Sequence, residues 1–85
     1  MKYQVRIEQT AEKQLSKLPK SELERLKVAV LSLADNPRPF GYKKLKGRSN
    51  AYRVRVGNYR IIYEINDGIL LVLVIAIGHR KEIYE

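Results

Sequence analysis

The feature that most constrains the fold is a pair of alternating segments on either side of Gly57 and Asn58. Residues 51–56 read AYRVRV and residues 59–65 read YRIIYEI, so apolar and polar side chains largely alternate in both. Period-two alternation is typical of a half-buried β-strand. A Gly-Asn pair tolerates the positive φ angles of a two-residue hairpin turn. The sequence therefore predicts an antiparallel hairpin whose register is set by this turn.

The predicted register gathers three arginines on one face of the sheet. Residues that lie opposite each other in a hairpin share a face, so Arg55 opposite Arg60 also brings Arg53 to that side. The other face then carries the apolar side chains of Tyr52, Val54, Val56, Tyr59, Ile61, Tyr63 and Ile65. Like charges opposite each other destabilise a sheet by about 0.2–1 kcal/mol. The cluster therefore favours a bound anion, and arginine suits phosphate; the alternative is that the three side chains extend into solvent and serve solubility.

The strand expected at Ile69–Ile77 is apolar on both faces, so its hydrophobic pattern does not set its register. A three-residue turn at 66–68 places Arg60 opposite Val74 and Arg80 on the arginine side; a two-residue turn places His79 there instead and Ile75 opposite Arg60. We favour the three-residue turn. It puts an apolar strip beside the arginines, formed by Ile62, Leu70, Val72 and Val74. Such a strip needs a loop or a partner protein to cover it.

The first part of the chain predicts a strand and two helices. Tyr3, Val5 and Ile7 alternate with polar residues, as in a half-buried strand. Thr10 is expected to cap a helix that ends at Pro19, and Ser21 with Glu24 fits a capping box for a second helix. The apolar stripes are Ala11, Leu15 and Leu18 in the first helix and Leu23, Leu26, Val30 and Leu33 in the second. The Asn-Pro-Arg-Pro segment at 36–39 stops the second helix.

Together these elements predict a single α+β domain over residues 1–85. A strand, a helical hairpin and a three-stranded antiparallel meander form one antiparallel sheet backed by two helices. Residues 40–50 are expected to be a loop anchored by Leu45. The chain has no cysteine, which excludes disulfides and thiolate zinc sites. Its longest apolar run has nine residues, against about 20 for a membrane span. We expect a cytoplasmic protein without membrane contact.

The positive charge is concentrated in one segment. The formal net charge is +8, and no acidic residue lies between Asp35 and Glu64. That interval holds Arg38, Lys43, Lys44, Lys46, Arg48, Arg53, Arg55 and Arg60, while the rest of the chain has nine basic and nine acidic residues. A local field of this kind favours a polyanion, with nucleic acid ahead of an anionic membrane or an acidic protein. Loop residues Lys43, Lys44, Lys46 and Arg48 are therefore candidates for RNA or phosphate contacts, although basic loops can also serve solubility alone.

The remaining reactive groups limit the chemistry. His79 is the single histidine and the acidic residues are scattered, so neither a histidine pair nor a metal site is predicted, and no cofactor is implied. RNA carries a 2′-hydroxyl beside its own phosphate, and arginines can stabilise the charge that develops when it attacks. A nuclease of this composition should therefore cut RNA. Arg80 could bind phosphate or protonate a leaving oxygen, and Tyr84 could stack on a base, orient the 2′-hydroxyl or act as base. His79 is a possible proton carrier, though a lone histidine in a turn is more often structural.

Four segments together resemble the RelE family of the RelE/ParE toxin superfamily. They are NPRP at 36–39, KKLKG at 43–47, AYRVRVGNYRIIYEI at 51–65 and GHRKEIY at 78–84, and the likeness covers essentially the whole chain. The resemblance implies the toxin of a type II toxin–antitoxin system. It would be a ribosome-dependent mRNA endonuclease, or mRNA interferase, that halts translation by 2′-hydroxyl attack. A cognate RelB-like antitoxin would restrain it, and the basic segment would contact ribosomal RNA.

By position, the resemblance assigns the family's catalytic roles to five residues: Arg53, Arg55, Arg60, Arg80 and Tyr84. Arg60 corresponds to the phosphate-binding arginine, Arg80 to the general acid and Tyr84 to the stacking tyrosine. Arg53 and Arg55 stand where the best-known member has lysines, and arginine hardly deprotonates, which leaves Tyr84 or His79 as the base. Two other functions remain open: a ParE-like inhibitor of DNA gyrase, and an RNA-binding module without catalysis.

Overall fold

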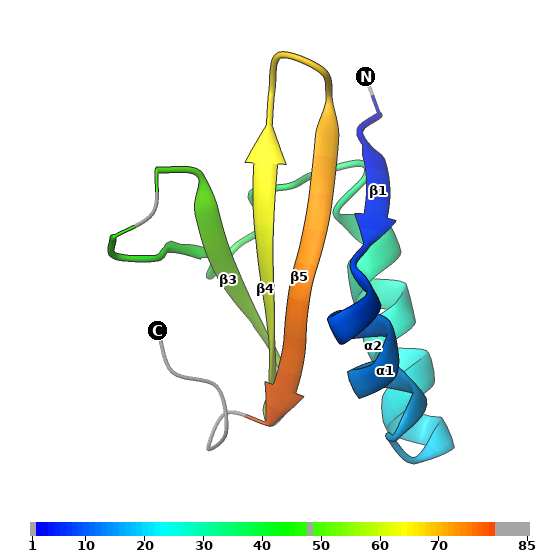
Figure 1. Cartoon of the computed structure of the whole chain (residues 1–85). Coiled ribbons are helices and arrows are strands. Elements are labelled where there is room, and N and C mark those ends of the chain that lie inside the picture. Colours follow the sequence, from blue (N-terminus) through cyan, green and yellow to red (C-terminus); the bar gives the residue numbers. More distant parts are fainter. Residues whose placement is uncertain (1, 48, 80–85) are drawn as a thin grey trace.

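The computed structural model describes residues 2–47 and 49–79, and their elements form a mixed α+β domain. In chain order they are β1 (Gln4–Ile7), α1 (Gln9–Ser16), α2 (Lys20–Ser32), β2 (Lys43–Lys44), β3 (Ala51–Val56), β4 (Tyr59–Asn66) and β5 (Leu71–His79) (Figure 1). The predicted fold class is confirmed, with its helical hairpin and antiparallel meander. Within residues 2–47 and 49–79, neither helix is long and apolar enough to cross a membrane.

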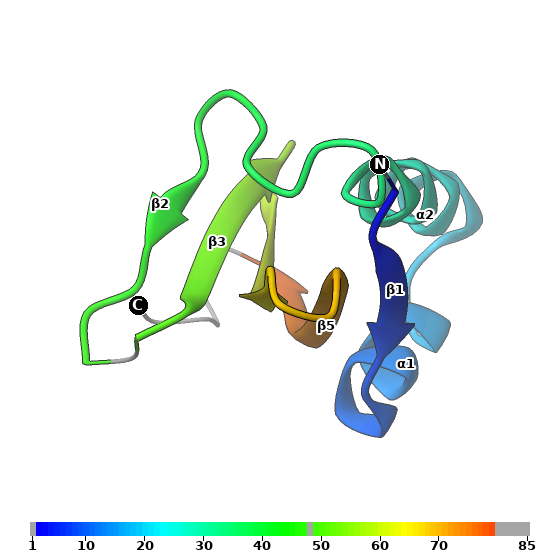
Figure 2. The same ribbon diagram turned by 90° about the horizontal axis from the view of Figure 1, so that it is seen from above.

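The sheet has the strand order β1-β5-β4-β3-β2. The pairs β2–β3, β3–β4 and β4–β5 are antiparallel, but β1 runs parallel to β5, so the prediction of a wholly antiparallel sheet is wrong for β1. Alternation identifies a strand without giving its direction, which here follows from the helical hairpin that connects β1 to the rest of the sheet. β2 is a two-residue edge strand within the segment predicted to be loop. Figure 2 shows β2 and β3 at the end of the sheet away from β1 and both helices.

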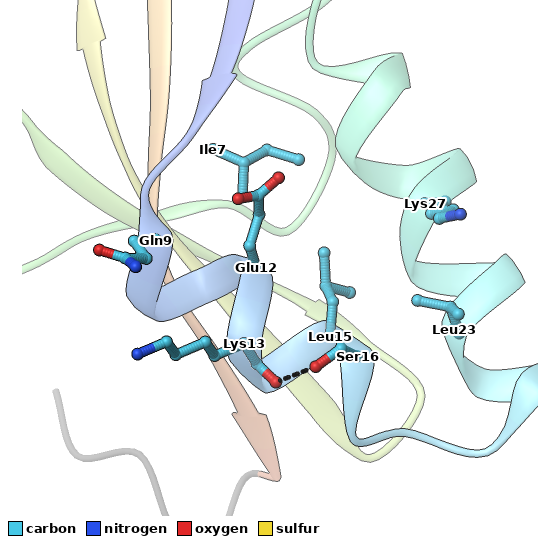
Figure 3. Close-up of a pocket in the computed structure, with 8 residues that line it drawn as sticks. All are labelled: Ile7, Gln9, Glu12, Lys13, Leu15, Ser16, Leu23 and Lys27. Carbon is cyan, nitrogen blue, oxygen red and sulfur yellow. Dashed lines mark hydrogen bonds between the residues drawn. The ribbon is translucent and has the colours of Figure 1, made fainter.

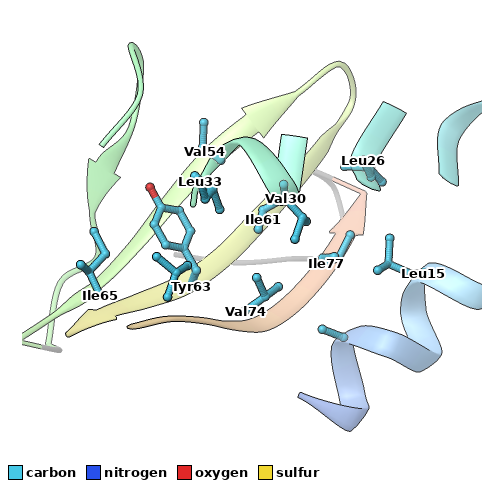
Figure 4. Packing of buried hydrophobic residues seen from close by; sticks show 12 residues of the cluster. Leu15, Leu26, Val30, Leu33, Val54, Ile61, Tyr63, Ile65, Val74 and Ile77 are labelled. Atoms are coloured by element: carbon cyan, nitrogen blue, oxygen red, sulfur yellow. The ribbon is translucent and has the colours of Figure 1, made fainter. Parts of the chain in front are cut away.

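The core lies between the two helices and one face of the sheet. The predicted helical stripes supply it, with Leu18 and Leu23 only half-buried at its margin. Its buried members are Ala11, Leu15, Leu26, Val30 and Leu33 from the helical hairpin, and Val54, Ile61, Tyr63, Ile65, Val72, Val74 and Ile77 from the strands. Figure 4 shows the side chains from the hairpin and from the strands meeting in one cluster. This burial provides most of the stabilisation expected for so small a domain.

Neither predicted side-chain cap forms. α1 begins at Gln9 behind Glu8, α2 begins at Lys20 behind Pro19, and neither preceding residue makes a side-chain capping bond. Thr10 therefore lies inside the first turn of α1. The sheet fixes where α1 begins, because the backbone N–H of Glu8 donates to the carbonyl of Val74 at 2.9 Å. Pro19 supplies an extended backbone with a fixed φ immediately before α2, a geometry that can precede a helix without a capping side chain.

The register of β5 differs from both predicted ones. Arg60 pairs with Gly78, rather than with Val74 or Ile75, because the turn after β4 is longer and the ladder contains a bulge. Asn66 pairs with Leu71, which leaves residues 67–70 in the turn, and the register shifts between Ile62 and Tyr63. The predicted pairing was counted from an assumed turn, so it could not include a longer turn or an extra residue in one strand.

The four-residue turn and the bulge together change which side chains share the arginine side of the sheet: the turn moves Val72 and Val74, and the bulge moves the residues of β5 that follow Val74. Val72 and Val74 were expected there, but both are fully buried in the core on the helical side. Pairing with β4 places Leu73 and Ala76 on the arginine side instead, next to Ile62. Leu70 belongs to the turn, where it has a φ of 51°. Of the predicted apolar strip only Ile62 keeps its place, and it is 7% exposed; Leu73 and Ala76 replace Leu70, Val72 and Val74.

The edge of β5 beyond β1 is occupied by a side chain from α1. β1 pairs with β5 from Leu71 to Val74, and β5 continues to His79. Past the end of β1, the Oε1 atom of Gln14 accepts a hydrogen bond from the backbone N–H of Ile77 at 2.6 Å. α1 is thereby attached to the last part of β5 by a polar contact as well as by its apolar stripe.

We expect Gly57→Ala to destabilise the protein by about 1–2 kcal/mol, because Gly57 has a φ of 61° that alanine adopts only with strain. A Cβ atom there would come within 2.4 Å of Nη1 of Arg25, the movable end of a long side chain, so the backbone cost dominates. Urea unfolding of Gly57→Ala and of Gly68→Ala measures the difference. Gly68 lies outside the left-handed region, and an equal loss in the two variants would contradict this explanation.

Candidate nucleic-acid interface

The arginine face is the face of the sheet opposite the helices, and it is defined here by Arg53, Arg55 and Arg60. β3 and β4 pair in the predicted register, with Arg55 opposite Arg60 and Arg53 opposite Ile62. Ile62 lies two residues after Arg60 on the same strand, so all three arginines emerge on one side. The two-residue turn at Gly57 and Asn58 produces this arrangement, because one residue more would separate Arg55 from Arg60.

The three arginines differ in exposure, which distinguishes what each can contact. Arg53 is only 6% exposed, Arg60 is half-buried and Arg55 is exposed. The Nε atoms of Arg53 and Arg60 are buried. Arg55 therefore presents its guanidinium most fully to an incoming anion, whereas Arg53 also fills space in the folded protein. Glu64 shares this face, about 13 Å along β4 from Arg60.

The short strand β2 divides the loop lysines between the two sides of the sheet. Lys43 pairs with Arg53 and so extends the arginine face, whereas Lys44 pairs with Tyr52 on the other face. Both lysines are exposed, as is Lys46 in the turn that follows. The sequence missed this division because two residues are too few for alternation to be recognised.

His79 lies away from the arginine face. It pairs with Tyr59, on the side of the sheet that carries the core, and the two rings meet edge to face with centroids 5.6 Å apart. The pair lines a cavity of about 430 Å³ together with residues of α1 that include Gln14 and Lys17. Arg48, Arg80 and Tyr84, which the sequence nominated for phosphate binding and catalysis, lie outside the described residues. Within the described ranges, His, Asp and Glu side chains form no group of three placed to hold a metal ion.

One cation of the basic segment is engaged in a contact that the sequence did not reveal. Arg38 donates to both carboxylate oxygens of Asp67, with Nη1–Oδ1 at 3.3 Å and Nη2–Oδ2 at 2.8 Å. Tyr3 donates its hydroxyl to the same carboxylate. These hydrogen bonds hold the pKa of Asp67 below its ordinary value, and the bond to Asp67 raises the pKa of Tyr3. Arg38 thus joins the segment before β2 to the β4–β5 turn.

A second contact anchors the same segment from the core. The buried hydroxyl of Tyr63 donates to the carbonyl oxygen of Pro37 at 2.7 Å, and burial raises the pKa of this phenol. Next to it, the guanidinium of Arg38 lies 5.9 Å from the ring centroid of Tyr52. The start of the basic segment is therefore fixed at Pro37 and at Arg38. These contacts help to set the position of β2 relative to the arginine face.

The contribution of Asp67 to stability should disappear in acid. A carboxyl whose folded-state pKa is lowered stabilises the fold above its unfolded pKa, near 3.8, and this stabilisation is lost as the pH falls through the lower folded value. We therefore expect Asp67→Asn to lower the Tm at neutral pH and to have little effect once the wild-type carboxyl is protonated. Thermal unfolding of both proteins from neutral pH to below 3.8 tests this. A difference in Tm that does not change with pH would contradict it.

A groove on the helical side has a different character. It has a volume of about 560 Å³ between α1, α2 and the end of β1, and its lining residues are Ile7, Gln9, Glu12, Lys13, Leu15, Ser16, Leu23 and Lys27 (Figure 3). The close-up shows Ser16 donating to the carbonyl of Lys13, at 2.8 Å, on the α1 side. Charges of both signs border an apolar floor, so this groove does not match a polyanion as the arginine face does.

Known proteins resemble the chain over nearly its whole length. A family model described as the ParE toxin of a type II toxin–antitoxin system matches residues 5–84. The mRNA interferase toxin RelE of Escherichia coli K12 is 30% identical over 89 residues, covering 100% of this chain and 93% of that protein. Toxin RelG of Mycobacterium tuberculosis is 32% identical over 86 residues, covering 100% and 99%. The chain belongs to the RelE family. It is accordingly a toxin of a type II toxin–antitoxin system within the RelE/ParE superfamily, and the resemblance predicted from four segments is confirmed.

Solved RelE structures share its architecture. The archaeal RelE of the RelE–RelB complex from Pyrococcus horikoshii superposes with a TM-score of 0.84 at 31% identity, covering 98% of this chain and 100% of that one. The toxin of the RelBE2 toxin–antitoxin complex from Mycobacterium tuberculosis also gives a TM-score of 0.84, at 29% identity, covering 94% and 100%. The RelE fold therefore extends over the meander that carries the arginine face.

Proposed function

We propose that this RelE-family toxin is an endoribonuclease that cuts mRNA on the ribosome and so inhibits translation. The observation that carries the proposal is the cross-strand pair of Arg55 and Arg60, with Arg53 and Lys43 on the same side of the sheet. Cations held at neighbouring strand positions are suited to bind the negatively charged phosphate of RNA. The E. coli relative that matches the whole chain is named an mRNA interferase, which supports the same activity here.

In the proposed reaction the RNA supplies its own nucleophile. The 2′-oxygen forms a bond to the adjacent phosphorus and loses its proton to a base, while the P–O5′ bond breaks and the 5′-oxygen gains a proton. The products are a 2′,3′-cyclic phosphate and a 5′-hydroxyl end. Arg55 and Arg60 would stabilise the charge on the phosphorane without exchanging protons, because arginine hardly deprotonates. No metal or cofactor takes part in this scheme.

The proton transfers are assigned to the end of the chain. We propose Arg80 as the acid and phosphate ligand, and Tyr84 as the residue that stacks on a base or accepts the 2′ proton. His79 is less suited to the role of base, since it lies against Tyr59 on the face opposite the arginines. Lys43, Lys46 and Arg48 would contact the phosphates of mRNA or ribosomal RNA, adding a strongly salt-dependent attraction.

The proposed protein partner is a cognate RelB-like antitoxin. The toxins of similar structure from P. horikoshii and M. tuberculosis were solved as complexes with their antitoxins. An antitoxin with acidic and apolar side chains would match the arginine face and its strip of Ile62, Leu73 and Ala76. Its binding should weaken as salt is added, because the contact is between opposite charges.

The experiment that tests the activity maps mRNA ends on translating ribosomes after induction of the wild type or Arg60→Ala. Arg60 is preferred to Arg53, whose burial would mix a folding defect with a catalytic one. Codon-linked 5′-hydroxyl ends that disappear in Arg60→Ala support the proposal. Arg6→Ala, which removes an exposed arginine from β1, is the matched control and should leave the ends unchanged.

A gyrase supercoiling assay in parallel tests the second candidate function, a ParE-like gyrase inhibitor. The observation in favour of that candidate is that the matching family model describes the ParE toxin. Gyrase inhibition with intact messages would support this candidate and contradict the proposed endoribonuclease. If neither message cleavage nor gyrase inhibition is observed, the remaining candidate is an RNA-binding module without catalysis.

A further inference from the structure

The turn from Pro39 to Tyr42 holds an aromatic side chain entirely in solvent. The N–H of Tyr42 donates to the carbonyl of Pro39 at 3.0 Å, and Gly41 has a φ of 88°, as in a type II turn. Phe40 occupies the outer corner of this turn and is 103% exposed. A single exposed apolar residue is ordinary on a protein surface, so the meaning of Phe40 depends on its neighbours.

The neighbours form an aromatic series that leads from the core to the surface. Tyr63 is buried, its ring centroid lies 6.1 Å from that of Tyr52, and the Tyr52 centroid lies 5.7 Å from that of Tyr42. Tyr42 is 36% exposed. Lys44, the strand partner of Tyr52, is exposed on the same side. Lys44 and Tyr52 lie on the opposite side of the β2–β3 pair from Lys43 and Arg53, Tyr42 contacts Tyr52, and Phe40 precedes Tyr42 by two residues in the turn. We call Phe40, Tyr42, Lys44 and Tyr52 the aromatic patch.

The patch is built on a fixed segment. Pro37 is held through its carbonyl by Tyr63, and Arg38 is held by both oxygens of Asp67. These two residues immediately precede the turn, so Phe40 is presented from an anchored backbone. A site that is fixed in advance loses less conformational entropy when it binds.

We propose that the aromatic patch stacks on an unpaired nucleotide of RNA, as a second RNA contact outside the arginine face. Aromatic rings stack on any base, and neighbouring cations neutralise the phosphates on either side. Residues 36–50 contain five cations and no acidic residue, which matches a polyanion. Aromatic side chains are common in protein–protein interfaces too, but lysine is depleted there, and every charged residue of this segment is a cation, which favours RNA. This inference rests on the proposed function only in the choice of RNA as the ligand.

The two sites would engage one strand of RNA across the β2 edge. Lys43 and Arg53 are on one side of this edge, and Lys44 and Tyr52 are on the other. Because β2 has only two residues, a single strand can pass from one side to the other around a narrow edge. Single-stranded RNA meets this requirement, whereas a duplex is too wide and has its bases stacked internally.

The chain contains no tryptophan, so Phe40→Trp introduces a fluorescent reporter with no background. We expect saturable quenching when this variant is titrated with a short single-stranded 2′-O-methyl adenosine oligonucleotide, which cannot be cut by 2′-hydroxyl attack. Leu31→Trp is the matched control, since Leu31 is 66% exposed on α2. It should show no quenching, and neither variant should respond to a duplex of the same length. Equal responses of the two variants, or none from Phe40→Trp, would overturn the proposal.

The affinity of the same oligonucleotide for Phe40→Ala provides a second readout. Loss of one stacked base should weaken binding about tenfold or more relative to the wild type, whereas Leu31→Ala should bind like the wild type. Unchanged affinity would refute the stacking site, as would a Phe40→Trp signal that responds to purified antitoxin and not to RNA. Quenching by RNA in a protein that cuts no message would refute the proposed endoribonuclease and leave the aromatic patch in place.

Discussion

Arg55→Thr should reduce message cleavage about 100-fold while leaving the protein at least as stable as the wild type. The loss of one charged group that stabilises a developing oxyanion typically costs 10²–10³-fold in rate, so about 100-fold is the lower end. Stability should not fall, because Arg55 is exposed and lies opposite Arg60, a like-charge pair that disfavours the sheet. Threonine is β-branched, which suits a strand position. Activity and stability should therefore change in opposite directions.

The measurement pairs end mapping on ribosomes with urea unfolding of the same preparations. Arg6→Thr is the control, because Arg6 is an exposed strand arginine in β1, three places from β3 in the sheet order. It makes the same chemical change without touching the Arg55–Arg60 pair, and cleavage should stay near the wild-type rate. If Arg55→Thr lost activity only in proportion to a loss of stability, the effect would belong to the fold and the arginine face would not be a phosphate site.

Leu26→Ala should remove much of the free energy of unfolding. Leu26 is completely buried where α2 meets the sheet, and leucine-to-alanine changes at such positions cost about 2–5 kcal/mol through lost burial and the cavity left behind. A domain of 85 residues is expected to have a total stability of only about 4–13 kcal/mol. The variant should therefore unfold at a markedly lower urea concentration.

The same helix offers a control for that substitution. Leu31 is 66% exposed, so Leu31→Ala makes an identical chemical change at a solvent-facing position and should alter the free energy of unfolding by no more than about 0.5 kcal/mol. Alanine is the better helix former of the two residues, so similar losses in both variants would contradict the explanation by burial in the core.

The hairpin and its arginines were predictable because the information is local. Gly57 and Asn58 determine the turn, and the turn determines that Arg55 meets Arg60. The helical stripes were predictable for the same reason, since residues three and four apart share a helix face.

The features that sequence reasoning missed depend on contacts between distant residues. The four-residue turn at 67–70, which moves Val74 to the core, and the bulge near Ile62 both leave no trace in the alternation. Arg38 was counted among the cations of the basic segment, but 29 residues separate it from Asp67, the carboxylate that binds it. The direction of β1 was missed for the same reason. The sequence identifies β1 as a strand, but its parallel pairing with β5 depends on the complete topology.

The hydrogen bond from Ile77 to Gln14 changes what the end of β5 offers to a strand of another copy. An apolar strand that outruns its neighbour normally offers its backbone as a template on which another copy can extend the sheet, the first step toward fibrils. Here the backbone N–H of Ile77 already donates to the side chain of Gln14, and α1 lies beside the part of β5 to which a strand of another copy would have to bind. The side chain of Gln14 therefore removes one backbone donor of β5 from the edge with which a strand of another copy could pair.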